Sequence, residues 1–101
     1  MAQKKLSPEE AKDRAAVLRQ RGSAALTRHF RERMQQRRVT MNDIGYLFET
    51  GIVQRTVEID DESERWEYTI RGKDLDGSDL AVVFSFDEVF GDLFLITVKD
   101  N

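Results

Sequence analysis

The spacing of apolar residues along the chain changes from a helical period to a strand period near Gly51. Before Gly51, apolar side chains recur every three or four residues, as they do on the buried face of a helix. After it they alternate with polar side chains, which is typical of a strand. The pattern therefore predicts helices first and strands second, an α+β arrangement.

Two to three helices are predicted in the first half. The segment SPEE at residues 7–10 supplies an N-cap serine, a proline in the first turn and a capping-box glutamate, and this helix should end near Gly22. A second helix is expected over residues 23–38. A third is expected from residue 40 to Gly51, which should adopt the left-handed conformation of a helix C-terminus.

The second half predicts a four-stranded antiparallel sheet on which the helices pack. The strands are expected at IVQRTVEI (52–59), RWEYTIRG (65–72), SDLAVVFSF (78–86) and LFLITV (93–98), with a hairpin at Asp76-Gly77. The first helix has a thin apolar face. We therefore expect residues 1–25 to form an N-terminal helical extension and residues 26–101 to form a single α+β domain.

The composition predicts a globular protein and indicates the cellular compartment in which it acts. The 101 residues suffice for one domain, and 40% hydrophobic with 35% charged residues is a globular composition. There is no cysteine, which excludes disulfides and thiolate metal sites. The first residues carry no apolar signal segment, and no apolar run reaches the length of a membrane span. These features predict a cytoplasmic protein with no membrane association.

The net charge of -3 conceals an uneven distribution. Residues 1–55 carry twelve Lys and Arg and six Asp and Glu, a net charge of +6. Residues 56–101 carry four basic and thirteen acidic side chains, a net charge of -9. Such asymmetry favours a polyanion or a charged protein as partner.

The stretch HFRERMQQRR at residues 29–38 contains the one histidine of the chain among arginines. On a helical wheel, Phe30 and Met34 continue an apolar stripe, and His29, Arg33 and Arg37 run beside it at spacing i, i+4, i+8. A charge on that border either lines a cleft, extends its head to solvent or is paired.

Two interpretations of this row remain open. In the first, His29 transfers protons and the arginines bind a phosphate in bidentate fashion. In the second the row is architectural. His29 is then a structural histidine, and the arginines pair with acids of the sheet such as Glu58, Glu67 or Asp87.

Four ordered motifs resemble an uncharacterised bacterial family, domain of unknown function 4258, over about residues 26–98. The first is H-x-x-x-R-M-x-x-R from His29 to Arg37, and Gly51 ends the following helix. The third is Y-x-x-x-G-x-x-x-D-G from Tyr68 to Gly77, and I-T-V at 96–98 closes the set.

That resemblance implies a relative of the RelE and BrnT toxins, with helices packed on an antiparallel sheet, RNA cleavage without a metal or cofactor, and neutralisation by a small antitoxin protein. RNA would be the substrate. The residues expected to act in catalysis are His29, Arg33, Arg37 and Tyr68, and those expected to bind RNA phosphate are Arg38, Arg71 and Lys73. For Tyr68 the alternative is packing, because it shares a strand face with Trp66 and Ile70.

A second hypothesis is a non-catalytic module on the same fold that binds a protein partner or forms a homo-oligomer. The acidic second half favours it, since nucleic-acid-binding domains are usually basic. The two hypotheses predict different surroundings for His29, Arg33 and Arg37: an open cleft shared with Tyr68 or Arg71 for the enzyme, and pairing with acids for the module.

Overall fold

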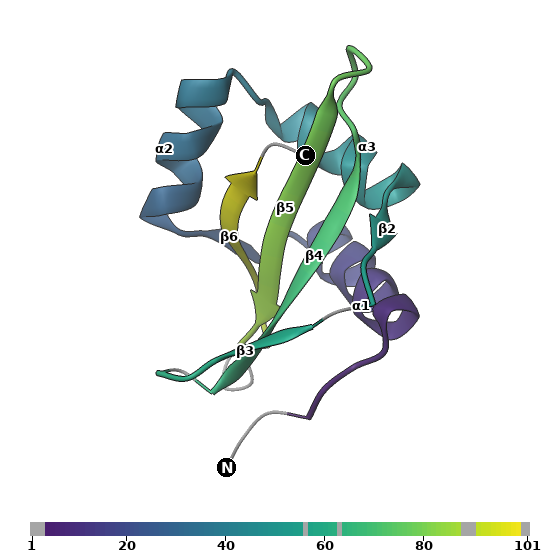
Figure 1. Ribbon diagram of the computed structural model, residues 1–101, viewed down its shortest axis with the longest axis vertical. Coiled ribbons are helices and arrows are strands. Elements are labelled where there is room, and N and C mark those ends of the chain that lie inside the picture. The colour runs from purple at the N-terminus through teal and green to yellow at the C-terminus, as the bar shows by residue number, and fades with distance from the viewer. Residues whose placement is uncertain (1–3, 56, 63, 88–90, 100–101) are drawn as a thin grey trace.

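The computed structural model describes residues 4–55, 57–62, 64–87 and 91–99, and has an α+β architecture of three helices and a mixed sheet (Figure 1). The elements in chain order are α1 (Pro8–Gln20), β1 (Ala24–Leu26), α2 (Arg28–Arg37), α3 (Met41–Thr50), β2 (Ile52–Val53), β3 (Glu58–Asp60), β4 (Arg65–Lys73), β5 (Asp79–Phe86) and β6 (Leu93–Lys99).

The strands run in the order β1-β6-β5-β4-β2, and β3 pairs with the first half of β4. The predicted antiparallel pairing of the last three long strands is confirmed. The single strand predicted over 52–59 is wrong: it is divided into β2 and β3, which pair with opposite halves of β4. Residue 56, between them, lies outside the described residues. The sheet is therefore larger than the predicted four strands.

The prediction of a helix from residue 23 is also wrong. Residues 24–26 form β1, which pairs parallel with the start of β6, and α2 begins only at Arg28 behind its N-cap, Thr27. The reason is tertiary, because the outer edge of β6 offers backbone partners that override local helix propensity. Leu93 N donates to Ser23 O at 2.8 Å and Thr27 N donates to Leu95 O at 3.1 Å.

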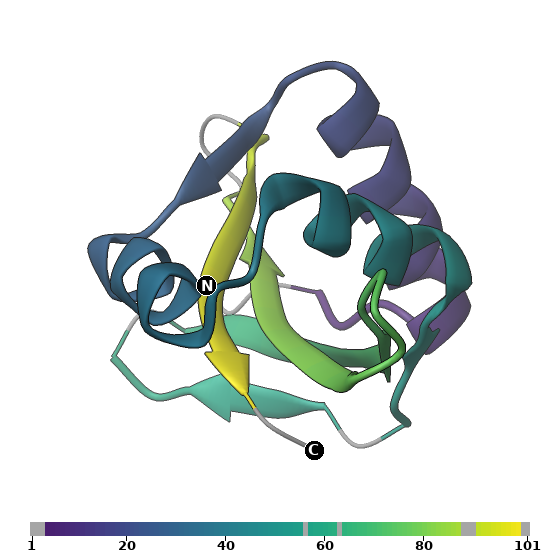
Figure 2. The same cartoon turned by 90° about the horizontal axis from the view of Figure 1, so that it is seen from above.

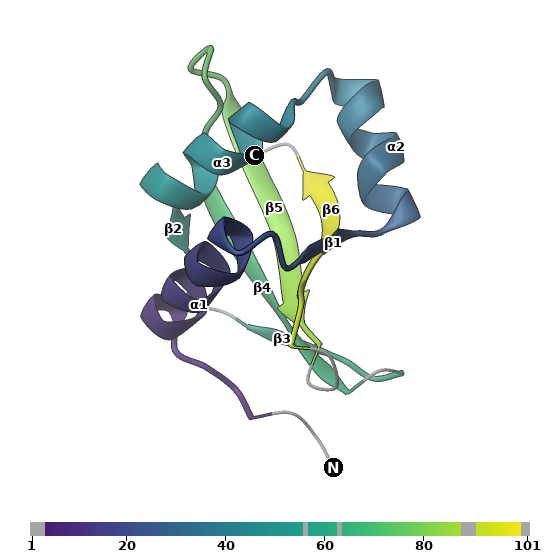
Figure 3. The ribbon, with the colours of Figure 1, turned by 180° about the vertical axis from the view of Figure 1, so that it is seen from behind.

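Helices α1 and α3 cover one face of the sheet, as the view from behind shows (Figure 3). Helix α2 lies at the β6 side, apart from the other two helices (Figures 1 and 2). The core lies between α1, α3 and the sheet, where the ring of Phe84 packs edge-on against Phe48 at 5.3 Å between centroids. Ala11 and Ala15 of α1 are fully buried in the same core. The opposite face of β4 and β5 carries no helix (Figure 1), and we call it the open face.

Gly51 ends α3 as predicted, but its expected left-handed conformation is wrong. Its φ is -77°, which any residue can adopt. The position needs glycine for space, since a Cβ there would lie 2.6 Å from the carbonyl oxygen of Leu47 and 2.9 Å from that of Arg71. The end of α3 therefore packs backbone to backbone on β4.

Asp43 joins the start of α3 to the β4–β5 hairpin. Its carboxylate accepts hydrogen bonds from Thr40 N at 2.9 Å and from Leu75 N at 3.0 Å, and Thr40 Oγ1 accepts in return from Asp43 N. The hairpin itself turns at Gly77, whose φ of +85° suits glycine. The backbone donors bound by Asp43 hold the pKa of its carboxyl below its ordinary value.

Replacing Asp43 with alanine is expected to lower the free energy of unfolding by about 2 kcal/mol, since it removes a cap and leaves two part-buried backbone donors without their acceptor. Because the folded pKa is depressed, the stabilisation is present above the unfolded pKa and is lost as the pH falls through the folded value. Urea unfolding at neutral and at acidic pH measures both effects. Exposed Asp76→Ala, in the same hairpin, is the control, and an equal loss in that variant would contradict the role given to Asp43.

Candidate functional site

The basic row of α2 lies on the helix as the wheel predicts. Arg33 and Arg37 are half-buried, whereas His29 is exposed in the first turn. Phe30 is fully buried below them. The imidazole of His29 is therefore accessible to a ligand in solvent.

Side chains of α2 and of its N-cap bind the outer edge of β6. Strand β1 covers only residues 93–95 of that edge. Beyond it, Thr27 Oγ1 donates to Ile96 O at 2.9 Å and Arg33 Nε donates to Val98 O at 3.4 Å. Backbone carbonyls at an exposed strand edge need such partners. Arg33 thus has an architectural role. Its guanidinium lies at the end of β6, because Val98, which it binds, directly precedes Lys99.

Tyr68 occupies the core. Its side chain is buried, its ring stacks on Phe84 with 5.6 Å between centroids, and its hydroxyl accepts a hydrogen bond from Leu6 N at 2.9 Å. Burial raises the pKa of Tyr68 above its ordinary value. The alternative interpretation of Tyr68 as a packing residue matches this position, and its hydroxyl fixes the segment that leads into α1.

Tyr68→Phe should consequently lower the free energy of unfolding by about 1 kcal/mol, because the amide of Leu6 loses its acceptor, and should leave any RNA cleavage unchanged. Cleavage rates and denaturant unfolding of the same preparation separate the two effects. A large loss of cleavage with unaltered stability would instead place the hydroxyl in the chemistry.

The three predicted phosphate-binding residues lie in different places. Arg38 is the C-cap of α2 in a left-handed conformation with φ of 55°. Lys73 forms an ion pair with its cross-strand neighbour Asp79. Arg71 lies on the open face, and its Nε donates to Gln54 Oε1 at 2.6 Å. As the strand period requires, Arg71 and Tyr68 face opposite sides of β4.

A polar cavity of about 150 Å³ lies around Arg71, and we call it the open-face pocket. It combines two cations, two carboxylates, an amide and a hydroxyl over one apolar side chain. The lining residues are Gln54, Glu58, Glu67, Thr69, Arg71, Val83 and Lys99. Only Arg71 among them was predicted as a site residue.

The charged form of Glu67 is disfavoured in the open-face pocket. Partial burial raises the pKa of its carboxyl, the charges of Asp60 and Glu58 raise it further, and Lys99 acts in the opposite sense. Glu58 is the direct cross-strand partner of Glu67, and like charges at opposed positions destabilise a sheet. Titratable groups held in such surroundings are frequent at functional sites.

The alternating pattern of β4 places Glu67, Thr69 and Arg71 on one face, so the sequence alone can predict that these three residues lie together. Gln54 and Lys99 join them only through the pairing of β4 with its neighbours. Register across strands depends on tertiary packing, which no local pattern specifies.

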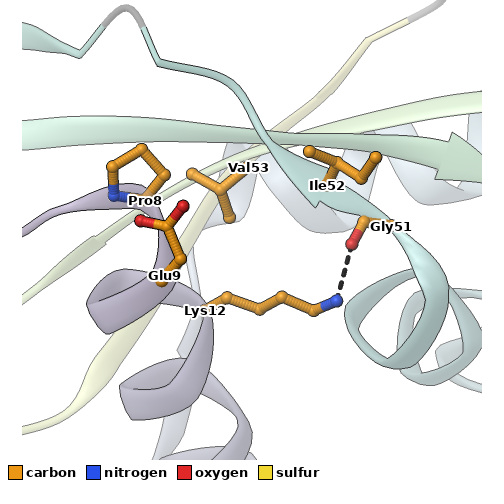
Figure 4. Close-up of a pocket in the computed structure, with 6 residues that line it drawn as sticks. All are labelled: Pro8, Glu9, Lys12, Gly51, Ile52 and Val53. Carbon is orange, nitrogen blue, oxygen red and sulfur yellow. Dashed lines mark hydrogen bonds between the residues drawn. The ribbon is translucent and has the colours of Figure 1, made fainter.

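Two further hollows differ in character. One lies at the C-terminal end of α2 and is lined by Met34 and Val39 with Arg31, Gln35, Arg38 and Thr40 around them, and we call it the α2 groove. The other lies between α1 and β2, where the side chain of Lys12 reaches across to Gly51 (Figure 4). Lys12 Nζ donates to Gly51 O at 2.7 Å, so a cation caps the C-terminal end of α3.

Among the residues that the structure describes, no group of three or more His, Asp or Glu side chains is placed to hold a metal ion. Within the same residues, no helix has the length and apolar character required to cross a membrane.

Comparison with known proteins identifies a family. The family model described as domain of unknown function (DUF4258) matches residues 26–100, which begins within β1 and includes α2, α3 and all later strands. Neither a curated protein nor a solved structure matches the chain significantly.

Proposed function

We propose, from the premise that the chain belongs to the DUF4258 family of domains of unknown function, that it is a toxin-like endoribonuclease that needs no metal. We propose further that the fold is RelE-like, with α1 and α3 on one face of the sheet and the chemistry on α2 and the open face. The protein acts in the cytoplasm, and a small antitoxin protein neutralises it.

One observation carries the proposal: the basic row of α2 and the open-face pocket meet at the end of β6. Arg33 binds the carbonyl of Val98, and Lys99, the next residue, lines the pocket. This end of β6 lies between α2 and β5, and β4 lies on the far side of β5 (Figure 1). The arrangement supports a continuous basic surface from His29 and Arg37 on α2 to Arg71, although the whole chain is acidic.

The proposed cleavage requires proton transfers and stabilisation of negative charge on the phosphate. The 2′-hydroxyl loses a proton, its oxygen bonds to phosphorus, and the P–O5′ bond breaks as the leaving oxygen takes up a proton. His29 is exposed, so its imidazole is accessible to RNA as the general acid or base of the proposed reaction. Arginine and lysine side chains stabilise the charge of the pentacovalent phosphorane.

The proposal is tested by incubating purified protein with total RNA in the presence of a chelator and following fragment lengths with time. We expect cleavage that is insensitive to the chelator and declines steeply with salt, since phosphate contacts release counterions. Intact RNA after incubation with well-folded protein is the result that rejects it.

The α2 groove favours a second candidate function, the protein-binding module. An apolar floor of Met34 and Val39 bordered by Arg31 and Arg38 is suited to an amphipathic segment with acidic residues. If the protein leaves RNA intact, this candidate predicts that Met34→Lys abolishes binding of a protein partner while the fold persists.

A further inference from the structure

The register of the sheet places two cations in one row on the open face. Arg71 of β4 and Lys99 of β6 are both direct cross-strand partners of Ala81 on the central strand β5. Neighbouring strands are ~4.8 Å apart, so the backbones that carry the two cations are about 10 Å apart. Both side chains are long enough to reach toward a group held between them.

The residue between the two cations is small. Ala81 is fully buried and contributes only a methyl group to the face, and the next row consists of Thr69, Val83 and Thr97. Arg71 and Lys99 both line the open-face pocket, together with Thr69 and Val83 of that next row. The hydrogen bond from Arg71 Nε to Gln54 holds the guanidinium plane in place. These are the features of an oxyanion site built on rigid strands.

The carboxylates of the pocket work against such an anion. Glu67 and Lys99 attract each other, and Glu58 and Asp60 add negative charge from β3. Without a ligand, Glu67 offsets the charge of Lys99. An entering anion must displace that interaction, and removal of the Glu67 charge should make its entry easier.

We propose that the open-face pocket binds a phosphodiester group of single-stranded RNA between Arg71 and Lys99, and that Glu67 competes with this phosphate for Lys99. The proposal rests on the proposed function and assigns to it a substrate subsite. Glu67 sets the affinity of that subsite without touching the phosphate.

The test is binding of a short fluorescent single-stranded 2′-deoxyoligonucleotide, measured by anisotropy over a range of salt concentrations. A deoxy strand has no 2′-hydroxyl and cannot be cleaved by this chemistry, so binding is separated from catalysis. Arg71→Gln and Lys99→Gln should each weaken binding about fivefold and reduce the salt slope by roughly 0.7. Glu67→Gln should strengthen binding about threefold, because it removes a like charge. Arg21→Gln, which removes an exposed cation at the C-cap of α1 outside the pocket, is the matched control and should change little.

The opposite signs distinguish the subsite from a structural effect, since damage to the sheet would weaken binding in all the variants. Unchanged affinity in Arg71→Gln and Lys99→Gln, or weaker binding in Glu67→Gln, overturns the proposal even if the protein cleaves RNA. If the variants change affinity in the expected directions but the protein leaves RNA intact, the phosphate subsite is supported and the nuclease activity is rejected. Inorganic phosphate is the second probe. If phosphate shifts the amide resonances of Arg71 and Lys99 while the substitutions at these residues leave oligonucleotide affinity unchanged, the pocket binds free phosphate and the proposal is wrong.

Discussion

Replacing His29 with alanine is expected to lower the rate of RNA cleavage by roughly 10²–10⁴-fold, the range typical of a lost general acid or base. His29 is exposed in the first turn of α2, so the variant should keep the fold and the free energy of unfolding of the wild type. The rate is measured on a defined RNA under single-turnover conditions, together with thermal unfolding of the same sample.

Arg31→Ala is the matched control for this substitution, because Arg31 is an exposed basic residue on the same helix. It should weaken RNA binding slightly and leave the rate at saturating protein nearly unchanged. Equal rates in His29→Ala and the wild type would remove His29 from the chemistry. Arg33→Ala should also lose cleavage, but it additionally removes the bond to Val98 O, so its stability must be measured beside its rate.

The largest effect on stability is expected from Gly51→Ala, which should lower the free energy of unfolding by about 3 kcal/mol. The added Cβ would lie within 3 Å of two backbone carbonyl oxygens, so α3 or β4 must move. Backbone atoms of packed elements cannot turn aside as a flexible side chain can. A loss of this size should lower the melting temperature of a domain of this length by roughly 10–20 °C.

Gly45→Ala, on the same helix, is expected to have the opposite sign. The nearest atom to its added Cβ is Nη1 of Arg19 at 3.2 Å, the end of a flexible side chain. Alanine in a helix interior is favoured over glycine by about 0.5–1 kcal/mol, so this variant should be as stable as the wild type or more stable. Similar losses at both positions would show that general packing of α3, rather than close backbone contact at Gly51, determines the result.

The parts of the fold that could be predicted from the sequence are those governed by local chemistry. Helix α1 begins at its Ser7 capping box, and α3 begins at Thr40, since caps are short-range interactions. The prediction over residues 24–26 was wrong because β1 exists only where the edge of β6 is available. Gly51 was placed correctly and explained incorrectly, because its neighbour Arg71 is distant in sequence.

In the candidate site, too, local features could be predicted from the sequence and tertiary contacts could not. Helical spacing correctly predicted that Arg33 and Arg37 lie at the border of the buried face. It could not indicate that Arg33 binds the carbonyl of Val98, or that Arg71 and Lys99 lie on either side of Ala81. The first depends on helix packing and the second on register, and both are set by the assembled core.

The central claim, cleavage of RNA without a metal, is tested most directly by the chemistry of the RNA ends that the protein creates. Attack by the 2′-hydroxyl leaves a 2′,3′-cyclic phosphate on one fragment and a 5′-hydroxyl on the other. We predict these ends in the presence of a chelator, and their loss in His29→Ala. Fragments with 5′-phosphate ends, or no fragments from a folded protein, would contradict the account.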